Sequence, residues 1–299
     1  MTLNCVWKNG KIINPDDAKI GITTHSLHYG SGVFEGIRAY NTSSGTAILM
    51  LEAHMKRFLY SMNAIGMKSK FTLEELCQAV KDTVKASGLD SCYIRPFAYF
   101  AEGGVSVLPS DDHPVDIVIY CLPMGRYLAA EFIDIKVSKY IRIHPQSTVA
   151  DAKISGHYVN SILASRECVG THYHESLLLD YNGNVAEGAA MNIFIVKDGE
   201  IITTPLGTIL DGITRKLVIM LAKDYGYKVR EEYFKVEDII NADEAFFCGT
   251  AAEITPVRSI DDHKLKNHQS VGPITKSLKD KFEEIKQGKA YKNTLTYIN

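Results

Sequence analysis

The sequence predicts an α+β fold arranged in two domains. Its length of 299 residues is large for a single hydrophobic core, and a composition of 45% hydrophobic and 23% charged residues is typical of globular proteins. Hairpin turn dipeptides occur among amphipathic helical stretches, without the regular strand–helix alternation of a doubly wound sheet. The segment CLPMGRYLAAE interrupts the pattern with Pro123 and Gly125, so we expect the link between the domains there.

The first domain begins with a predicted β-hairpin. Asn9-Gly10 lies between apolar residues in CVWKNGKII, and this dipeptide is a strong signal for a two-residue hairpin turn. LEAHMKRFLYSMNAIG then predicts a helix that ends at Gly66, because its apolar residues recur at helical spacing. These apolar residues are Met55, Phe58, Leu59, Met62 and Ile65.

A second helix and two strands complete the first domain. TLEELCQAVKDTVKASG opens with the capping-box pair Thr72 and Glu75 and closes at Gly88, which favours a helix with both ends defined. CYIRPFAYFA and VDIVIYCL, the latter at 115–122, are rich in β-branched and aromatic residues and predict strands.

The second domain continues the mixture of strands and helices. FIDIKVSKYIRI alternates between apolar and polar residues, which predicts a strand over 132–143. Asn182-Gly183 and Asp198-Gly199 predict two further hairpin turns. The remaining predicted elements are helices in YVNSILASRECV, ITRKLVIMLAKDYG, VEDIINA and GPITKSLKDKFEEIKQG and a strand in EAFFCGT.

The charge balance argues against nucleic acid and membranes as partners. The 33 basic and 35 acidic residues give a net charge of −2, and the chain has no polybasic run. No apolar run approaches the ~20 residues that span a bilayer, and MTLNCVWKNG lacks the pattern of a signal peptide. The six cysteines are scattered without a CxxC pair, so we expect reduced thiols in a cytoplasmic protein.

Two charged residues stand in unusual surroundings. Lys153 is the only lysine in TVADAKISGHYVNSILA, where desolvation would make its amine more nucleophilic and suit it to a carbonyl partner; an ordinary surface lysine is the alternative. Glu187 enters the apolar stretch VAEGAAMNIF, where a carboxylate needs a cationic or N–H partner such as a protonated ring nitrogen. An exposed residue beside a bulge at Gly188 is the alternative for Glu187.

Three places have the chemistry of an anion site. Gly212-Ile213-Thr214 opens a predicted helix, Gly249-Thr250 ends a strand in a turn, and Arg57 offers a guanidinium. The chain has no P-loop and no dinucleotide-binding glycine motif, so a nucleotide is not supported. An amine for a Schiff base, donors for a phosphate and a carboxylate for a ring nitrogen are what a pyridoxal phosphate enzyme needs.

Seven segments, running nearly from end to end of the chain, strengthen this interpretation. They are HYGSGVFEGIRAY (28–40), HMKR (54–57), YIRP (93–96), AKISGHY (152–158), EGAAMNIF (187–194), GITR (212–215) and GTAAEITPVRSID (249–261). The set resembles the motifs of the class IV aminotransferases, fold type IV pyridoxal phosphate enzymes with the D-amino acid aminotransferase-like fold, and within them the branched-chain amino acid aminotransferases. The resemblance implies a small N-terminal α+β domain at 1–122, a loop at 123–130 and a larger cofactor-binding α+β domain at 131–299, with the cofactor between the domains.

The resemblance also implies a role for each matching residue near the cofactor, pyridoxal 5'-phosphate. Lys153 would form the Schiff base and then carry the proton between the substrate Cα and the cofactor. Tyr158 would hydrogen-bond the ring hydroxyl group, and Glu187 would pair with the ring nitrogen. The residues implied for the phosphate are Arg57, Ile213, Thr214, Gly249 and Thr250.

Substrate contacts follow from the resemblance in the same way. Arg95 would meet the distal carboxylate of glutamate or 2-oxoglutarate. The residues implied for the α-carboxylate are Tyr93, supported by Arg38, and the backbone of Thr250 and Ala251. The residues implied around an aliphatic side chain are Phe34, Tyr29 and Tyr127, with Val107 from a neighbouring subunit.

The implied reaction moves the amino group of L-leucine, L-isoleucine or L-valine to 2-oxoglutarate by a ping-pong mechanism, in a homodimer at minimum and possibly a hexamer. The alternatives of the same fold are a D-amino acid or (R)-amine transaminase and 4-amino-4-deoxychorismate lyase. These keep the lysine and the glutamate but tend to lack the combination of FEGIR, YIR and GTAAEITPV, which this chain has.

Two positions depart from the family pattern. Ala190-Met191 stands where many bacterial members have Gly-Glu, and Met124 stands where a tryptophan is common. These changes bear on which side chains the pocket accepts rather than on the chemistry. His172 and His174 are spaced to share one face of a strand, but no third ligand cluster accompanies them, so we expect no metal site.

Overall fold

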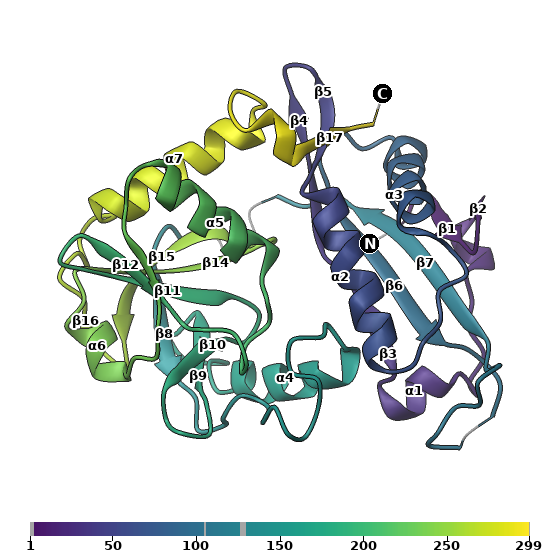
Figure 1. Ribbon diagram of the computed structural model, residues 1–299, viewed down its shortest axis with the longest axis horizontal. Coiled ribbons are helices and arrows are strands. Elements are labelled where there is room, and N and C mark those ends of the chain that lie inside the picture. The colour runs from purple at the N-terminus through teal and green to yellow at the C-terminus, as the bar shows by residue number, and fades with distance from the viewer. Residues whose placement is uncertain (1–2, 105, 126–129, 299) are drawn as a thin grey trace. The chain divides into compact units, whose positions relative to one another are not determined.

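The computed structural model describes residues 3–104, 106–125 and 130–298 (Figure 1). Its contacts divide the chain into two compact units. Unit 1 holds the chain up to Gly125 together with Ala152–Gly156 and the C-terminal segment from Ile285, and unit 2 holds the rest. Two stretches from the second half of the sequence, one of which carries Lys153, therefore belong to unit 1, and no local pattern indicated this.

Within its described residues, unit 1 is built on an antiparallel sheet of eight strands. The strand order is β17-β5-β4-β6-β7-β1-β2, and β3 pairs with β6. The strands are β1 (Val6–Lys8), β2 (Lys11–Ile13), β3 (Gly32–Phe34), β4 (Ile37–Thr42), β5 (Gly45–Leu49), β6 (Cys92–Phe100), β7 (Val115–Leu122) and β17 (Leu295–Tyr297). The helices are α1 (His25–Tyr29), α2 (Leu51–Ala64) and α3 (Leu73–Ser87), with 3-10 turns at Pro15–Asp17 and Lys292–Thr294.

The local signals for the first half of the chain are confirmed. Asn9 and Gly10 both have positive φ angles, 48° and 97°, and connect β1 to β2. The Thr72 hydroxyl accepts the Glu75 N–H, and the Glu75 carboxylate accepts the Thr72 N–H, so the predicted capping box begins α3.

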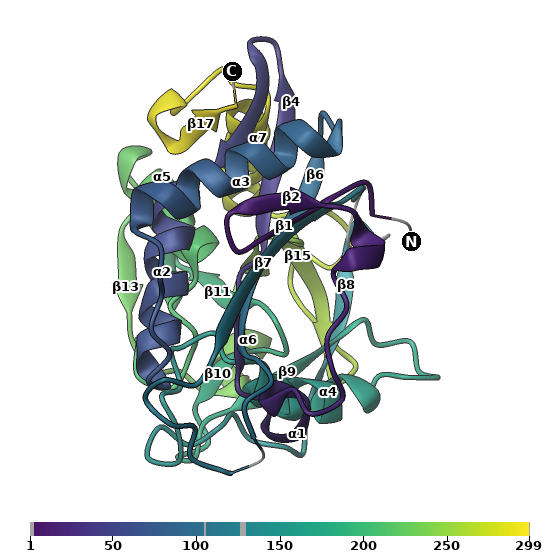
Figure 2. The ribbon, with the colours of Figure 1, turned by 90° about the vertical axis from the view of Figure 1, so that its right-hand side faces the viewer.

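Helices α2 and α3 pack against the sheet of unit 1 and enclose its core (Figure 2). Met55, Phe58 and Met62 of α2 are wholly buried in this core. The same helix also buries two polar residues, His54 and Ser61. Buried polar groups need partners, and those of His54 and Ser61 lie in the candidate site described below.

Unit 2 is built on a mixed sheet of nine strands within its described residues. The order is β10-β9-β8-β15-β14-β11-β12-β13, with β16 beside β15; β8 runs parallel to both β9 and β15, and β12 parallel to β13. The strands are β8 (Ile133–Val137), β9 (Glu175–Leu179), β10 (Val185–Gly188), β11 (Asn192–Lys197), β12 (Glu200–Thr203), β13 (Val229–Glu231), β14 (Glu244–Gly249), β15 (Glu253–Ile260) and β16 (His263–Lys264). The helices are α4 (Tyr158–Arg166), α5 (Ile213–Asp224), α6 (Val236–Ile240) and α7 (Pro273–Lys286), of which α7 passes into unit 1 at Ile285. A 3-10 turn at Ser155–His157 begins in unit 1 and ends in unit 2.

The strand predicted over 132–143 is shorter than expected, because β8 ends at Val137. Ser138 donates its hydroxyl to Glu167 at 2.5 Å, and the Lys139 N–H also goes to that carboxylate at 3.2 Å. The Tyr140 N–H goes to the Ser138 hydroxyl. Side chains thus take the backbone donors that a longer strand would offer to a neighbour. The two hairpin turns predicted in this half are confirmed between β9 and β10 and between β11 and β12.

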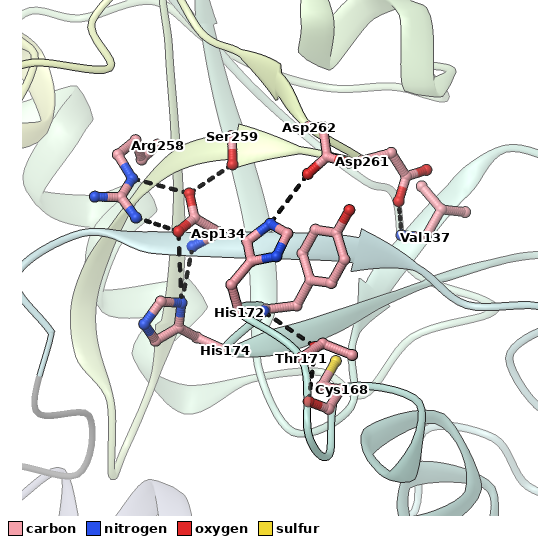
Figure 3. Close-up of polar contacts among 11 residues, drawn as sticks. Asp134, Val137, Cys168, Thr171, His172, His174, Arg258, Ser259, Asp261 and Asp262 are labelled. Atoms are coloured by element: carbon pink, nitrogen blue, oxygen red, sulfur yellow. Dashed lines mark hydrogen bonds and ion pairs between the residues drawn. The ribbon is translucent and has the colours of Figure 1, made fainter.

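Asp134 joins β8 to β15 and to the THYHE segment (Figure 3). Its buried carboxylate accepts the Arg258 Nε–H at 2.9 Å and the Ser259 hydroxyl at 2.5 Å, and its N–H donates to His174 Nδ1. Hydrogen bonds from Arg258 hold the pKa of Asp134 below its ordinary value. His172 pairs instead with Asp262.

The described residues contain no group of three side chains that could hold a metal, and no helix among them has the length and apolar character to cross a membrane.

Candidate active site

Lys153 is fixed through its backbone to two elements of unit 1. Its N–H donates to the Ser61 hydroxyl of α2 at 2.9 Å, and its carbonyl accepts the N–H of Phe34, at the end of β3, at 3.1 Å. The Lys153 Nζ lies 4.9 Å from the centroid of the Phe34 ring. The amine therefore stands on a rigid base against an aromatic face, as a reacting amine requires.

Arg95 and Tyr93 of β6 lie beside the same ring. The Arg95 guanidinium is 4.7 Å from the centroid of Phe34, and its Nη2 donates to the Tyr93 hydroxyl at 2.8 Å. A side chain on Gly36 would bring its Cβ to 2.1 Å from the Tyr93 hydroxyl, so only glycine fits in this part of FEGIR. Unit 1 thus brings together two cations and two aromatic rings. We call this surface, which consists of Phe34, Tyr93, Arg95 and Lys153, the wall of unit 1.

Arg38 lies next to Tyr93 in the register of β4 and β6. Its guanidinium donates to the carbonyls of Met124 and Gly125, at 3.3 and 3.4 Å. The family resemblance gave Arg38 a role in supporting Tyr93, while the hydrogen bond to the Tyr93 hydroxyl comes from Arg95. Arg38 holds the loop that follows β7.

Arg57 of α2 is clamped by Glu35, a residue that the sequence interpretation did not single out. The Arg57 Nε–H and Nη2–H donate to the two carboxylate oxygens at 2.6 and 2.9 Å, and His54 Nδ1 lies 2.7 Å from Oε2. Burial raises the pKa of Glu35, but Arg57 and His54 outweigh burial and hold it far below its ordinary value. Burial lowers the pKa of His54, so a neutral ring donates its Nδ1–H to an ionised Glu35.

Glu187 of β10 is buried in unit 2, which excludes the alternative of an exposed residue beside a bulge. Arg142 Nε donates to Oε1 at 2.5 Å, Asn192 Nδ2 donates to Oε2 at 3.0 Å, and the Leu210 N–H lies 3.2 Å from both oxygens. Arg142 was not predicted, because it lies 45 residues away in sequence. A buried carboxylate in an apolar strand signals only that some donor exists.

The helix start at Ile213 is tied to Glu187 through Asn192. The Asn192 amide donates to Glu187 and, at 3.1 Å, to the Leu210 carbonyl. A Cβ on Gly212, the residue before α5, would lie 2.0 Å from the Asn192 Oδ1, so any other residue there would force the Asn192 side chain to move. Gly212 has no side chain with which to cap α5, and the first N–H groups of a helix have no partner within the helix. The α5 N-terminus therefore has the backbone N–H groups that an anion site uses, and its role in holding a phosphate stays a prediction.

The other predicted residues lie as follows. Thr214 of α5 is buried, Thr250 follows β14 in a turn, and Tyr158 begins α4. Tyr29 of α1 and Val107 are 42% and 76% exposed. Phe34 and Arg95 are half-buried, as are Gly249 and Ala251 on either side of Thr250. Tyr127 lies outside the described residues.

Met191, one of the two departures from the family pattern, belongs to the apolar core of unit 2 and is 4% exposed. Ala190, beside it, is exposed. A methionine fits this core without a polar group to satisfy. Met124 lies in the loop that Arg38 holds.

Comparison with known proteins identifies the family. Residues 32–260 match the amino-transferase class IV family. The chain belongs to the class IV aminotransferases. Its relatives include the branched-chain-amino-acid aminotransferases of Pseudomonas aeruginosa (37% identical, covering 95% of this chain and 93% of that protein) and Escherichia coli K12 (39% identical, covering 93% and 91%).

Solved class IV structures resemble the whole chain. The branched-chain amino acid aminotransferase of Escherichia coli is 37% identical with a TM-score of 0.97, and both chains are covered fully. The enzyme of the same name from Thermobaculum terrenum, in its PLP-form, is 36% identical with a TM-score of 0.92, covering 100% of this chain and 99% of that chain. The resemblance and the α+β fold class inferred from the sequence are confirmed.

Proposed function

We propose that this chain is a pyridoxal 5'-phosphate-dependent aminotransferase that moves the amino group of L-leucine, L-isoleucine or L-valine to 2-oxoglutarate. The observation that carries the proposal is the wall of unit 1, where Lys153 and Arg95 lie beside one ring, Phe34. One pocket must accept an aliphatic side chain in one half of the cycle and a second carboxylate in the other. An aromatic surface with a single arginine near the reacting amine serves both.

The residues present fit the cofactor. It needs an amine, an acceptor for its protonated ring nitrogen and several donors for its phosphate, and Lys153, Glu187, Arg57 and the α5 N-terminus offer these groups. The further residues proposed to hold it are Tyr158, Ile213, Thr214, Gly249 and Thr250. When bound, the cofactor supplies an electron sink for the electron pair left at the substrate Cα.

The chain's own residues would then act in distinct ways. The Lys153 Nζ takes the proton from the substrate Cα and later returns a proton. Hydrogen bonds fix the Lys153 backbone, which limits the positions that the amine can adopt. Glu187 would accept the ring N–H, and hydrogen bonds from Arg142 and Asn192 fix the orientation of its carboxylate. The 2-oxo acid from the first substrate leaves before the acceptor binds, which gives the ping-pong order.

Substrate recognition is proposed on the same wall. Arg95 binds the distal carboxylate of glutamate or 2-oxoglutarate, and Phe34 contacts the aliphatic side chain. The further residues proposed for substrate are Tyr29, Arg38, Tyr93, Tyr127, Thr250 and Ala251, with Val107 of a second subunit. Val107 is 76% exposed and Leu108 81% exposed, which supports a homodimer in which this loop meets a partner.

The D-amino acid and (R)-amine transaminases and the lyase are not favoured, because the relatives named above are branched-chain aminotransferases over nearly the full chain. We also propose that the enzyme works in the cytoplasm. All six cysteines are free thiols, as expected for a reducing compartment.

An absorbance spectrum of the protein loaded with pyridoxal 5'-phosphate tests the proposal. We expect a visible band that bleaches when L-leucine or L-glutamate is added in separate cuvettes, with 4-methyl-2-oxopentanoate and 2-oxoglutarate as the respective products. A band that bleaches with a D-amino acid or a simple amine, and with neither L-substrate, would contradict it.

A further inference from the structure

Glu35 follows β3 and carries a fully enclosed negative charge. Its side chain has no exposure, and its carboxylate accepts two N–H groups from Arg57 and one from His54. The Gly36 N–H lies 3.3 Å from Oε2. An ionised group this deep is tolerated only where hydrogen-bond donors replace the lost water, and these N–H groups do so for Glu35.

The two hydrogen bonds between Arg57 and Glu35 fix the plane of the guanidinium as well as balancing its charge. The Nε and Nη2 atoms lie along one edge of the guanidinium, and both donate to the same carboxylate. The remaining N–H groups are therefore directed toward the opposite edge, at a set angle. A lysine, or an arginine without Glu35, would lack this direction.

The clamp also holds the helix that supports Lys153. His54, Arg57 and Ser61 recur at spacings of three and four residues on one face of α2. Glu35 binds the first two, and Ser61 accepts the Lys153 N–H. One buried carboxylate thereby orders the face of α2 that meets the Lys153 segment.

We propose that Glu35 is a positioning residue for the cofactor phosphate and acts by aiming Arg57. The inference rests on the proposed function, in which Arg57 binds that phosphate. Removing the negative charge would by itself favour a phosphate dianion, so the proposal requires that geometry outweighs charge. A glutamine at position 35 would place an NH2 group against the donors of Arg57 or His54, and the arginine would turn away.

The test compares two ligands that differ only in the phosphate group. Cofactor-free protein is titrated with pyridoxal 5'-phosphate and with pyridoxal, and the Kd values are measured from absorbance. For Glu35→Gln we expect affinity for pyridoxal 5'-phosphate to fall by at least about tenfold, with pyridoxal binding changed less than about twofold. The matched control is Glu52→Gln, which changes an exposed acid on α2, the helix that carries Arg57; Glu52 pairs with Lys56, and this variant should leave both affinities unchanged.

Each other outcome has a meaning. Equal losses for both ligands would reduce Glu35 to a structural role, and unchanged affinities would refute the proposal. If Glu35→Gln does not fold, Glu35→Asp keeps the charge but shortens the clamp, and the same selective loss is expected. A wild-type protein that binds both ligands equally would refute the proposed cofactor, and Glu35 with it; a wild-type preference that survives in both Glu35 variants would refute Glu35 alone.

Discussion

Two buried glutamate–arginine pairs, one in each unit, use the same chemistry in opposite ways. In unit 1 Glu35 pairs with Arg57, and in unit 2 Glu187 pairs with Arg142. Among the described residues, four donors reach the Glu35 carboxylate, two of them from Arg57. Within the same described part of the chain, three donors reach Glu187, and Arg142 supplies one.

The two arginines therefore engage their carboxylates differently: Arg57 donates through two N–H groups and Arg142 through one. In the proposed function Glu35 is the support, and Arg57 is the group that meets the ligand. For Glu187 the proposed roles are reversed: the carboxylate meets the ring N–H of the cofactor, and Arg142 is the support. Breaking either pair should therefore impair different steps.

Lys153→Ala gives the lowest transamination rate, with which variants of both pairs are compared. We expect a folded protein whose transamination falls by more than about 10³-fold, because the variant lacks the amine proposed to carry the proton. The measurement is the single-turnover rate with L-leucine, with circular dichroism as the control for folding. Substantial remaining turnover would contradict the assignment of the amine.

Glu187→Gln should separate the two pairs. Turnover is expected to fall by about 10²-fold, since a neutral amide cannot balance a protonated ring. Affinity for the cofactor's phosphate group should be retained, unlike in Glu35→Gln. The measurement combines kcat with the ratio of Kd values for pyridoxal 5'-phosphate and pyridoxal. A loss of phosphate selectivity in Glu187→Gln would break the comparison.

The sequence predicted some members of these pairs and not their partners. Glu187 stood out because a carboxylate in an apolar strand demands a donor. Glu35 has the same signature in VFEGIR and could have been found by the same argument. Arg142 and Arg57 lie 45 and 22 residues from their carboxylates, so their pairing depends on the tertiary fold.

The fold divides in the same way between local and distant causes. The turn at Asn9-Gly10 and the cap at Thr72 depend on neighbouring residues and were predicted correctly. The end of β8 depends on Glu167, whose carboxylate reaches Ser138 across 29 residues. β17, near the C-terminus, pairs with β5, and no local sequence pattern predicts this pairing.

Arg95→Ala tests an arginine that has no carboxylate partner among the described residues. Its guanidinium contacts Phe34 and Tyr93 on the wall of unit 1, which leaves it suited to a substrate carboxylate. We expect kcat/KM for L-glutamate to fall by about 10- to 100-fold, with L-leucine affected much less. Steady-state kinetics with both substrates measures this. Equal losses would contradict a role at the distal carboxylate.

Glu175 of β9 is a buried glutamate with no arginine among its described partners, and it gives the smallest expected effect. Burial raises the pKa of Glu175, only partly offset by hydrogen bonds from Ser176 and Ala189. The folded state therefore binds its proton more tightly than the unfolded state does. This group's contribution to stability is full below the ordinary carboxyl pKa and is lost as pH rises through the raised value.

Glu175→Gln should accordingly stabilise the protein at pH 8, by on the order of 1 kcal/mol, and have little effect at pH 4. Urea unfolding at both pH values measures the change. Glu200→Gln is the control of opposite sign, because a hydrogen bond from Lys228 lowers the pKa of Glu200 and the loss of that charge should destabilise at pH 8. A Glu175→Gln variant less stable than wild type at pH 8 would mean that the buried charge has a partner after all, and that an arginine is not what distinguishes Glu35 and Glu187 from it.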